Sequence, residues 1–251
     1  GGTVEANIVG DDTVAGVAAT LGGGGNATVK QDPASPAWPA YIQLNTTTGA
    51  VTVDPLSPAG THTLNYELCE AINPTNCRTE TVTVTITPGI SLGKVASSNS
   101  FTVGASGQYY DITVTVASGP TTAAINLGDT LPTGITLAGA PTKQAGSTSS
   151  GVLSACPVTG TNLAGCVIAA GASSGSIVVR VPINVAASAT SGQNTATATG
   201  GGDPACTASG TCTVTTPPVG VGSNPIKAND ETGSAPSIGG TAISNVYAND
   251  T

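Results

Sequence analysis

The chain has 251 residues, of which 8% are charged and 3% are aromatic, while glycine (34) and proline (17) are abundant and methionine is absent. Its formal net charge is −8 with only six lysines and arginines, so there is no basic patch for nucleic acid or for an anionic membrane surface. No apolar run is long enough to cross a bilayer as a helix, and no membrane span is expected.

Short runs in which apolar and polar residues alternate predict antiparallel β-strands throughout the chain. Apolar residues make up 39% of the sequence, many of them β-branched, and no stretch has a sustained helical period. Turn-forming residues recur between the runs. We therefore expect an all-β fold of tandem β-sandwiches with antiparallel sheets and no substantial helix.

The first predicted domain covers residues 1–89. "YIQLNTTTGAVTVDP" predicts a strand, a turn at Thr48-Gly49 and a second strand, and residues 61–87 predict two longer strands around the loop "CEAINPTNC". Eight acids and two bases give this domain a charge of −6. Pro88-Gly89 marks its end.

The second predicted domain covers residues 90–217, with strands expected in "YYDITVTVA", "GSIVVRVPINVAA" and "NTATATG". Residues 218–225 are predicted to form an extended Pro/Gly linker. Residues 226–251 are too few for a domain and contain the strand-like "TAISNVY". The sequence begins without methionine or a signal peptide, so we expect a processed chain or part of a longer one.

Six cysteines lie in three close pairs: Cys69 with Cys77, Cys156 with Cys166, and Cys206 with Cys212. Domain separation requires Cys69 to pair with Cys77, and short loops favour local pairing in the second domain. Disulfides indicate an oxidising, extracellular compartment. Buried free thiols are the alternative.

Residues 44–87, with the TGAVTV hairpin and the NPTNC loop, resemble the second half of a cadherin-like tandem repeat of large bacterial surface proteins. In such repeats the first half ends in a strand like "NVLANDT", and here "SNVYANDT" ends the chain instead. The second domain resembles an Ig-like conserved repeat domain of bacterial cell-wall proteins, in "YDITVTVASGP", "LGDTLPTGITL" and "QNTATATG". Both resemblances imply extracellular, repetitive all-β proteins and no assigned chemistry.

This order of segments predicts a structural repeat unit of a bacterial surface filament or stalk. Residues 226–251 are expected to form the opening strands that complete residues 1–89 of the next copy, head to tail. The expected contacts are made by Ile226, Ile243, Val246 and Tyr247. The partner copy is either a separate subunit or the next repeat of one polypeptide. The alternative is an adhesin that binds a glycan or protein ligand through loops 138–152 and 200–211.

Little in the sequence points to catalysis, and we expect no enzyme. His62, the single histidine, shares a strand face with Leu64 and Tyr66 and is expected to pack there. Trp38 is expected to pack against the first domain.

No cofactor is expected, although calcium is a weak candidate. Asp11, Asp12, Asp230 and Asp250 offer loop carboxylates that suit Ca²⁺, but without the spacing of a known calcium loop. Lys–Asn isopeptide bonds occur in some surface sandwich domains, and Lys30 and Lys94 are the candidate lysines, although no sequence feature selects either.

Overall fold

The computed structural model describes residues 1–207 and 212–223, and these contain strands but no helix. The prediction of an all-β fold is confirmed for this part of the chain. Two separate apolar clusters divide it into an N-terminal body, residues 1–87, and a C-terminal body from residue 89 onward. Since no helix is present in the described ranges, none of them holds a helix that could span a membrane.

The N-terminal body has two three-stranded antiparallel sheets, in the orders β1-β6-β5 and β4-β7-β8, and a small hairpin of β2 and β3. The bounds are β1 (Gly2–Glu5), β2 (Thr13–Val14), β3 (Val17–Ala18), β4 (Ala27–Gln31), β5 (Ile42–Leu44), β6 (Val51–Val53), β7 (Gly60–Glu70) and β8 (Cys77–Ile86).

Apolar and polar residues alternate along the strands, and the apolar ones form the core of this body. Leu64, Tyr66 and Leu68 of β7 are buried, and so is Val84 of β8. They pack with residues of the other sheet in one cluster that includes Ile42, Val51 and Val53. Because successive strand residues point to opposite faces, the same pattern leaves the intervening threonines of β8 in solvent.

The C-terminal body also has two main antiparallel sheets: β13-β17-β11-β9, with β14 added on β17, and β15-β16-β12-β18-β19. The bounds are β9 (Gly89–Ala96), β10 (Ser100–Thr102), β11 (Gln108–Ala117), β12 (Ile125–Thr130), β13 (Ile135–Leu137), β14 (Thr142–Lys143), β15 (Leu153–Ser154), β16 (Cys166–Ile168), β17 (Gly175–Val185), β18 (Thr195–Gly200), β19 (Thr213–Thr215) and β20 (Gly220–Gly222). Its core takes residues from both sheets, with Tyr110, Ile112 and Val114 of β11 fully buried at its centre.

The prediction of a linker at 218–225 is wrong for its described part. β20 pairs in parallel with β10, with Phe101 opposite Val221, and Val219 is buried against the C-terminal core. Two glycines and two prolines around these valines hid the strand, because both residue types are depleted in strands. Residues 224 and 225 lie outside the described ranges.

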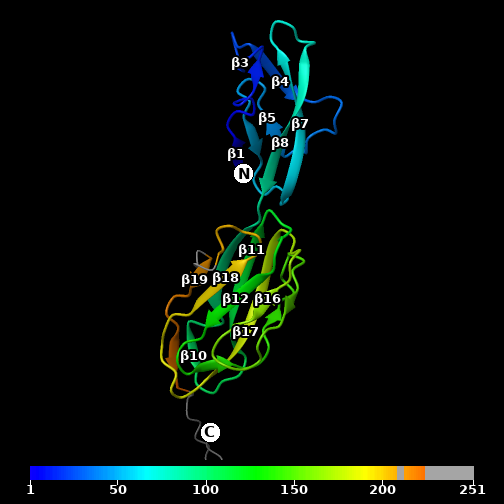
Figure 1. Ribbon diagram of the computed structural model, residues 1–251. Coiled ribbons are helices and arrows are strands. Elements are labelled where there is room, and N and C mark those ends of the chain that lie inside the picture. Colours follow the sequence, from blue (N-terminus) through cyan, green and yellow to red (C-terminus); the bar gives the residue numbers. More distant parts are fainter. Residues whose placement is uncertain (208–211, 224–251) are drawn as a thin grey trace, which may run out of the picture.

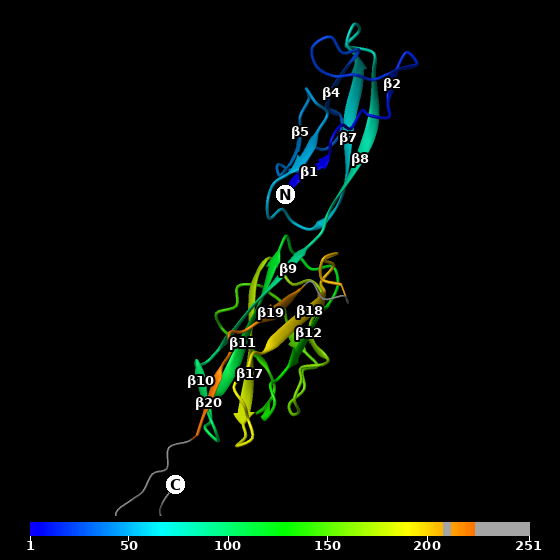
Figure 2. The same ribbon diagram turned by 90° about the vertical axis from the view of Figure 1, so that its left-hand side faces the viewer.

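The two bodies lie end to end (Figure 1), and the chain passes between them where β8 leads into β9. The N–H of Ala59 donates a hydrogen bond of 3.1 Å to the carbonyl of Gly119 across this junction. Figure 2 shows β10 and β20 at the end of the C-terminal body farthest from the N-terminal body. The last described strand therefore lies at the end of the C-terminal body that faces away from the N-terminal body.

Candidate strand-acceptor groove

Strand β8 is one of the two edges of its sheet, and β4 is the other. Strand β8 pairs with β7 over an unbroken register from Cys69 opposite Cys77 to Gly60 opposite Ile86. In the sheet order β4-β7-β8, no described strand pairs with its other side. Such an edge presents unpaired N–H and C=O groups, which is the template that an added strand requires.

The register shows which residues present those groups. The N–H of Glu70 donates to the carbonyl of Asn76, which marks a hydrogen-bonded position in the ladder. The next pair, Cys69 and Cys77, has a Cα separation of 4.0 Å, close to the short spacing of non-hydrogen-bonded positions. The two kinds of position alternate along an antiparallel ladder. It follows that the backbone groups of four residues turn away from β7 toward the open edge: Thr79, Thr81, Thr83 and Thr85.

A groove, lined by residues 1–15 on one side and β8 on the other, follows this edge. Near the Cys69–Cys77 disulfide it holds a cavity of 240 Å³ lined by residues 13–15 and 76–78. Beside the middle of β8 there is a cavity of 540 Å³, lined by residues between Glu5 and Asp12 and by residues 80–83. At the junction with the C-terminal body there is a cavity of 210 Å³, lined by residues 1–4 and 85–87. Separate cavities therefore lie beside the start, the middle and the end of β8.

Apolar side chains along the groove are incompletely covered. Val82 and Ile86 of β8 pack against the core but are only partly buried, whereas Val84 between them is 2% exposed. Val4, on the opposite wall, is 48% exposed. Alternate apolar side chains on an incoming strand would find partners here.

The middle of the groove is acidic, because Glu5, Asp11, Asp12 and Glu80 all line it. The Tyr66 hydroxyl lies 2.9 Å from the carbonyl oxygen of Ile8 and 3.0 Å from Asp12 Oδ2. Burial, reinforced by the Asp12 carboxylate, raises the pKa of Tyr66. The neutral hydroxyl therefore anchors the segment around Ile8 to β7.

The predicted calcium ligands are not all placed. Asp11 and Asp12 lie in the groove wall, while Asp230 and Asp250 lie outside the described residues. Within those residues, two three-residue sets have metal-ligand spacing: Glu67 with Cys69 and Cys77, and Asp203 with Cys206 and Cys212. Both sets depend on sulfur atoms that are already joined in disulfides, so neither offers thiolate ligands.

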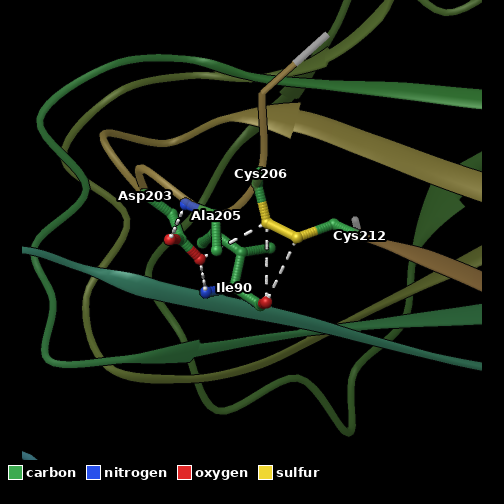
Figure 3. The surroundings of a disulfide bond; sticks show 5 residues. All are labelled: Ile90, Asp203, Ala205, Cys206 and Cys212. Atoms are coloured by element: carbon green, nitrogen blue, oxygen red, sulfur yellow. Dashed lines mark hydrogen bonds between the residues drawn. A yellow bond between two sulfur atoms is a disulfide. The ribbon is translucent and has the colours of Figure 1, made fainter. Parts of the chain in front are cut away.

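The structure contains three disulfides, Cys69–Cys77, Cys156–Cys166 and Cys206–Cys212, which are the local pairings predicted from spacing. The last of these lies beside Ile90, near the start of β9 (Figure 3). Asp203 accepts a 2.6 Å hydrogen bond from the N–H of Ile90, and both sulfurs lie 3.5 Å from the Ile90 carbonyl oxygen.

Loop 138–152, one of the two predicted adhesin loops, is tied to its own body. Lys143 Nζ donates to the carbonyls of Ser149 and Gly151, and the N–H of Gln144 bonds to Val178 of β17. In the other loop, 200–211, residues 208–211 lie outside the described ranges. The bonds of Lys143 and Gln144 occupy polar groups of loop 138–152 that would otherwise be free to bind a ligand.

The structure also places the two aromatic residues singled out from the sequence. His62 packs edge-on against Tyr41 with ring centroids 5.8 Å apart, and its Nε2 is buried without a hydrogen-bond partner. Trp38 is buried, with its indole N–H donating 2.8 Å to the Asn65 carbonyl. The predicted complementing residues Ile226, Ile243, Val246 and Tyr247 lie outside the described residues.

Comparison of the sequence with models of known protein families finds no match. Comparison with curated proteins finds no significant match either.

Proposed function

We propose that the chain is a structural repeat unit of an extracellular bacterial surface filament or stalk, in which the groove on β8 receives residues 226–251 of a neighbouring copy. The observation that carries the proposal is the open β8 edge with cavities beside its start, middle and end. The cadherin-like and Ig-like resemblances supply the bacterial surface setting. Three disulfides are compatible with an extracellular location.

In the C-terminal body a late strand lies beside an early strand, in a two-stranded sheet separate from the two main sheets. There, the late strand β20 pairs in parallel with the early strand β10. In the N-terminal body, the last strand β8 has no such early partner among the described residues. The resemblance assigns an opening strand to residues 226–251, and we propose that this strand is the partner of the β8 edge.

The groove also gives the added strand a direction. Gly1 lines its junction end together with Ile86. A segment that precedes Gly1 in the repeat order would run from the Cys77 end to the Ile86 end, parallel to β8.

Assembly by this contact is open-ended. The described chain leaves the C-terminal body at β20, at the end away from the N-terminal body (Figure 2). The next N-terminal body would therefore lie beyond this end, and such a head-to-tail contact generates a fibre rather than a closed ring. The copies are either separate subunits or repeats of one polypeptide. The mass of the native polypeptide after denaturation and reduction distinguishes these two versions.

Substitution of Thr83 tests the contact. Thr83→Pro removes an N–H that faces the open edge while leaving the β7–β8 ladder intact, since edge strands tolerate proline. The full chain and Thr83→Ala, which keeps the N–H, should associate as concentration rises. Thr83→Pro should associate at least about tenfold more weakly, the loss expected from about 1.4 kcal/mol. Sedimentation velocity measures association, and circular dichroism shows that all three chains are folded. Equal association of the two variants would refute the proposed contact.

A further inference from the structure

Three polar side chains meet inside the C-terminal body, where the alternation of β9 would place an apolar residue. Lys94 of β9 and Asp129 of β12 both have side chains that are 0% exposed, and Asn194, just before β18, is 1% exposed. Lys94 Nζ lies 2.7 Å from Asp129 Oδ1. The Asn194 amide nitrogen, Nδ2, donates 3.5 Å to the other carboxyl oxygen, Asp129 Oδ2. One carboxyl group therefore touches both nitrogens.

This set is poorly satisfied as a non-covalent arrangement. Lys94 Nζ, Asp129 Oδ1 and Asn194 Oδ1 are buried without a directional hydrogen-bond partner, even though the first two are close enough for an ion pair. Buried polar groups in folded proteins are normally paired, and an unpaired group calls for an explanation. A buried ion pair also gains little over its desolvation cost.

The surroundings exclude water and favour the uncharged forms. Lys94 Nζ lies 4.9 Å from the centroid of the Tyr110 ring, which packs edge-on against Phe101, and both aromatic residues are 0% exposed. Burial lowers the pKa of Lys94 to about 8, despite the opposing effect of Asp129. Burial likewise raises the pKa of Asp129, against the effect of Lys94. A neutral amine is a nucleophile, and a protonated carboxyl can donate a proton.

We propose that Lys94 and Asn194 are joined by an intramolecular isopeptide bond, with Asp129 carrying the proton from the attacking nitrogen to the leaving nitrogen. Lys94 Nζ attacks Asn194 Cγ. Asp129 Oδ1 takes a proton from Nζ, and Oδ2 gives its proton to Nδ2. The Nζ–Cγ bond forms, the Cγ–Nδ2 bond breaks, and ammonia leaves. The carboxyl group ends in its starting state, so no other reactant is needed.

The position of Asp129 favours Asn194 over Asp129 itself as the group attacked, because its two oxygens contact the nucleophile and the leaving group separately. The N–H of Asn194 donates to Thr216 Oγ1 and its carbonyl accepts from the N–H of Thr216, so the backbone that carries the Asn194 side chain is held in place. The other candidate lysine, Lys30, is 55% exposed and pairs with Glu67, so it has no comparable site.

The bond would join β9 to the start of β18, which lies in the other main sheet. It would hold the two layers of the C-terminal body together independently of the disulfides. This consequence holds whether or not the chain assembles into filaments.

The intact mass of the full chain, reduced and denatured, tests the proposal directly. The expected mass is below that of the sequence by one ammonia. Proteolysis should yield a branched peptide in which the Lys94 fragment and the Asn194 fragment are joined. A mass equal to that of the full sequence, with no loss of ammonia, would overturn the proposal without recourse to any variant. A deficit of one water, with Lys94 joined to Asp129, would overturn the assignment of Asn194.

Variants test the roles of the three residues. Asn194→Ala and Lys94→Arg should abolish the ammonia deficit, whereas Lys143→Met should keep it. Asp129→Ala should leave the bond unformed although both joined residues are present. Circular dichroism shows whether each variant folds. A deficit that persists in folded Asn194→Ala would place the lost ammonia elsewhere and contradict the proposal.

Discussion

Replacing Lys94 by methionine should lower the free energy of unfolding of the C-terminal body by about 3–5 kcal/mol, the usual effect of leaving one partner of a buried ion pair alone. Lys94 and Asp129 are both fully buried, and among the described residues Asn194 is the other side chain that bonds to Asp129. Both chains compared should carry Asn194→Ala, so that the isopeptide bond is absent from each. Urea denaturation measures the difference.

Lys30→Met in the same background is the matched control. Lys30 forms an ion pair of 2.9 Å with Glu67, but its side chain is 55% exposed. Exposed pairs contribute about 0–1 kcal/mol, so the control should change stability by less than that. Adding Asp129→Leu to the Lys94→Met chain should recover part of the loss, because no unpaired carboxyl then remains buried. Equal effects of Lys94→Met and Lys30→Met would contradict the burial argument.

A peptide with the sequence of residues 226–251 should stabilise the N-terminal body of the dilute full-length chain. At a peptide concentration about 100 times its Kd, binding adds about 2.7 kcal/mol. For a body of this size, that corresponds to a rise in melting temperature on the order of 10 °C. The physical reason is that the peptide pairs with the open edge of β8 and covers Val82 and Ile86. Scanning calorimetry measures the shift.

The matched control is the same peptide with Ile243→Asp and Val246→Asp, which keeps its backbone but loses its two central apolar side chains. It should produce a much smaller shift. If both peptides raise the melting temperature equally, or if only the C-terminal body is stabilised, the groove is not the site of residues 226–251.

Local patterns predicted much of the N-terminal body. The long pair β7 and β8, the clamped loop between them and the local disulfide follow from alternation and turn chemistry over adjacent residues. Which backbone groups face the open edge could not be predicted. That depends on the position of hydrogen-bonded pairs in the ladder, which the sequence does not specify.

Lys94 was a candidate isopeptide lysine from the sequence, but its partners Asp129 and Asn194 escaped prediction for a different reason. The three residues come from β9, β12 and the approach to β18, and they meet only after both sheets have formed. One local signal was available: Lys94 follows Ile90 and Leu92 on the inward-facing side of β9, where a charged residue breaks the apolar alternation. β20 was missed because its glycines resemble a linker.

Residue-resolved amide hydrogen exchange on β8, before and after the full chain associates, tests the central claim most directly. The amides of Val82 and Val84 bond to β7 and should be protected in both states. Those of Thr79, Thr81, Thr83 and Thr85 face the open edge, and they should exchange quickly in the dilute chain and become protected on association. Association that leaves these four threonine amides in fast exchange would contradict strand addition at β8.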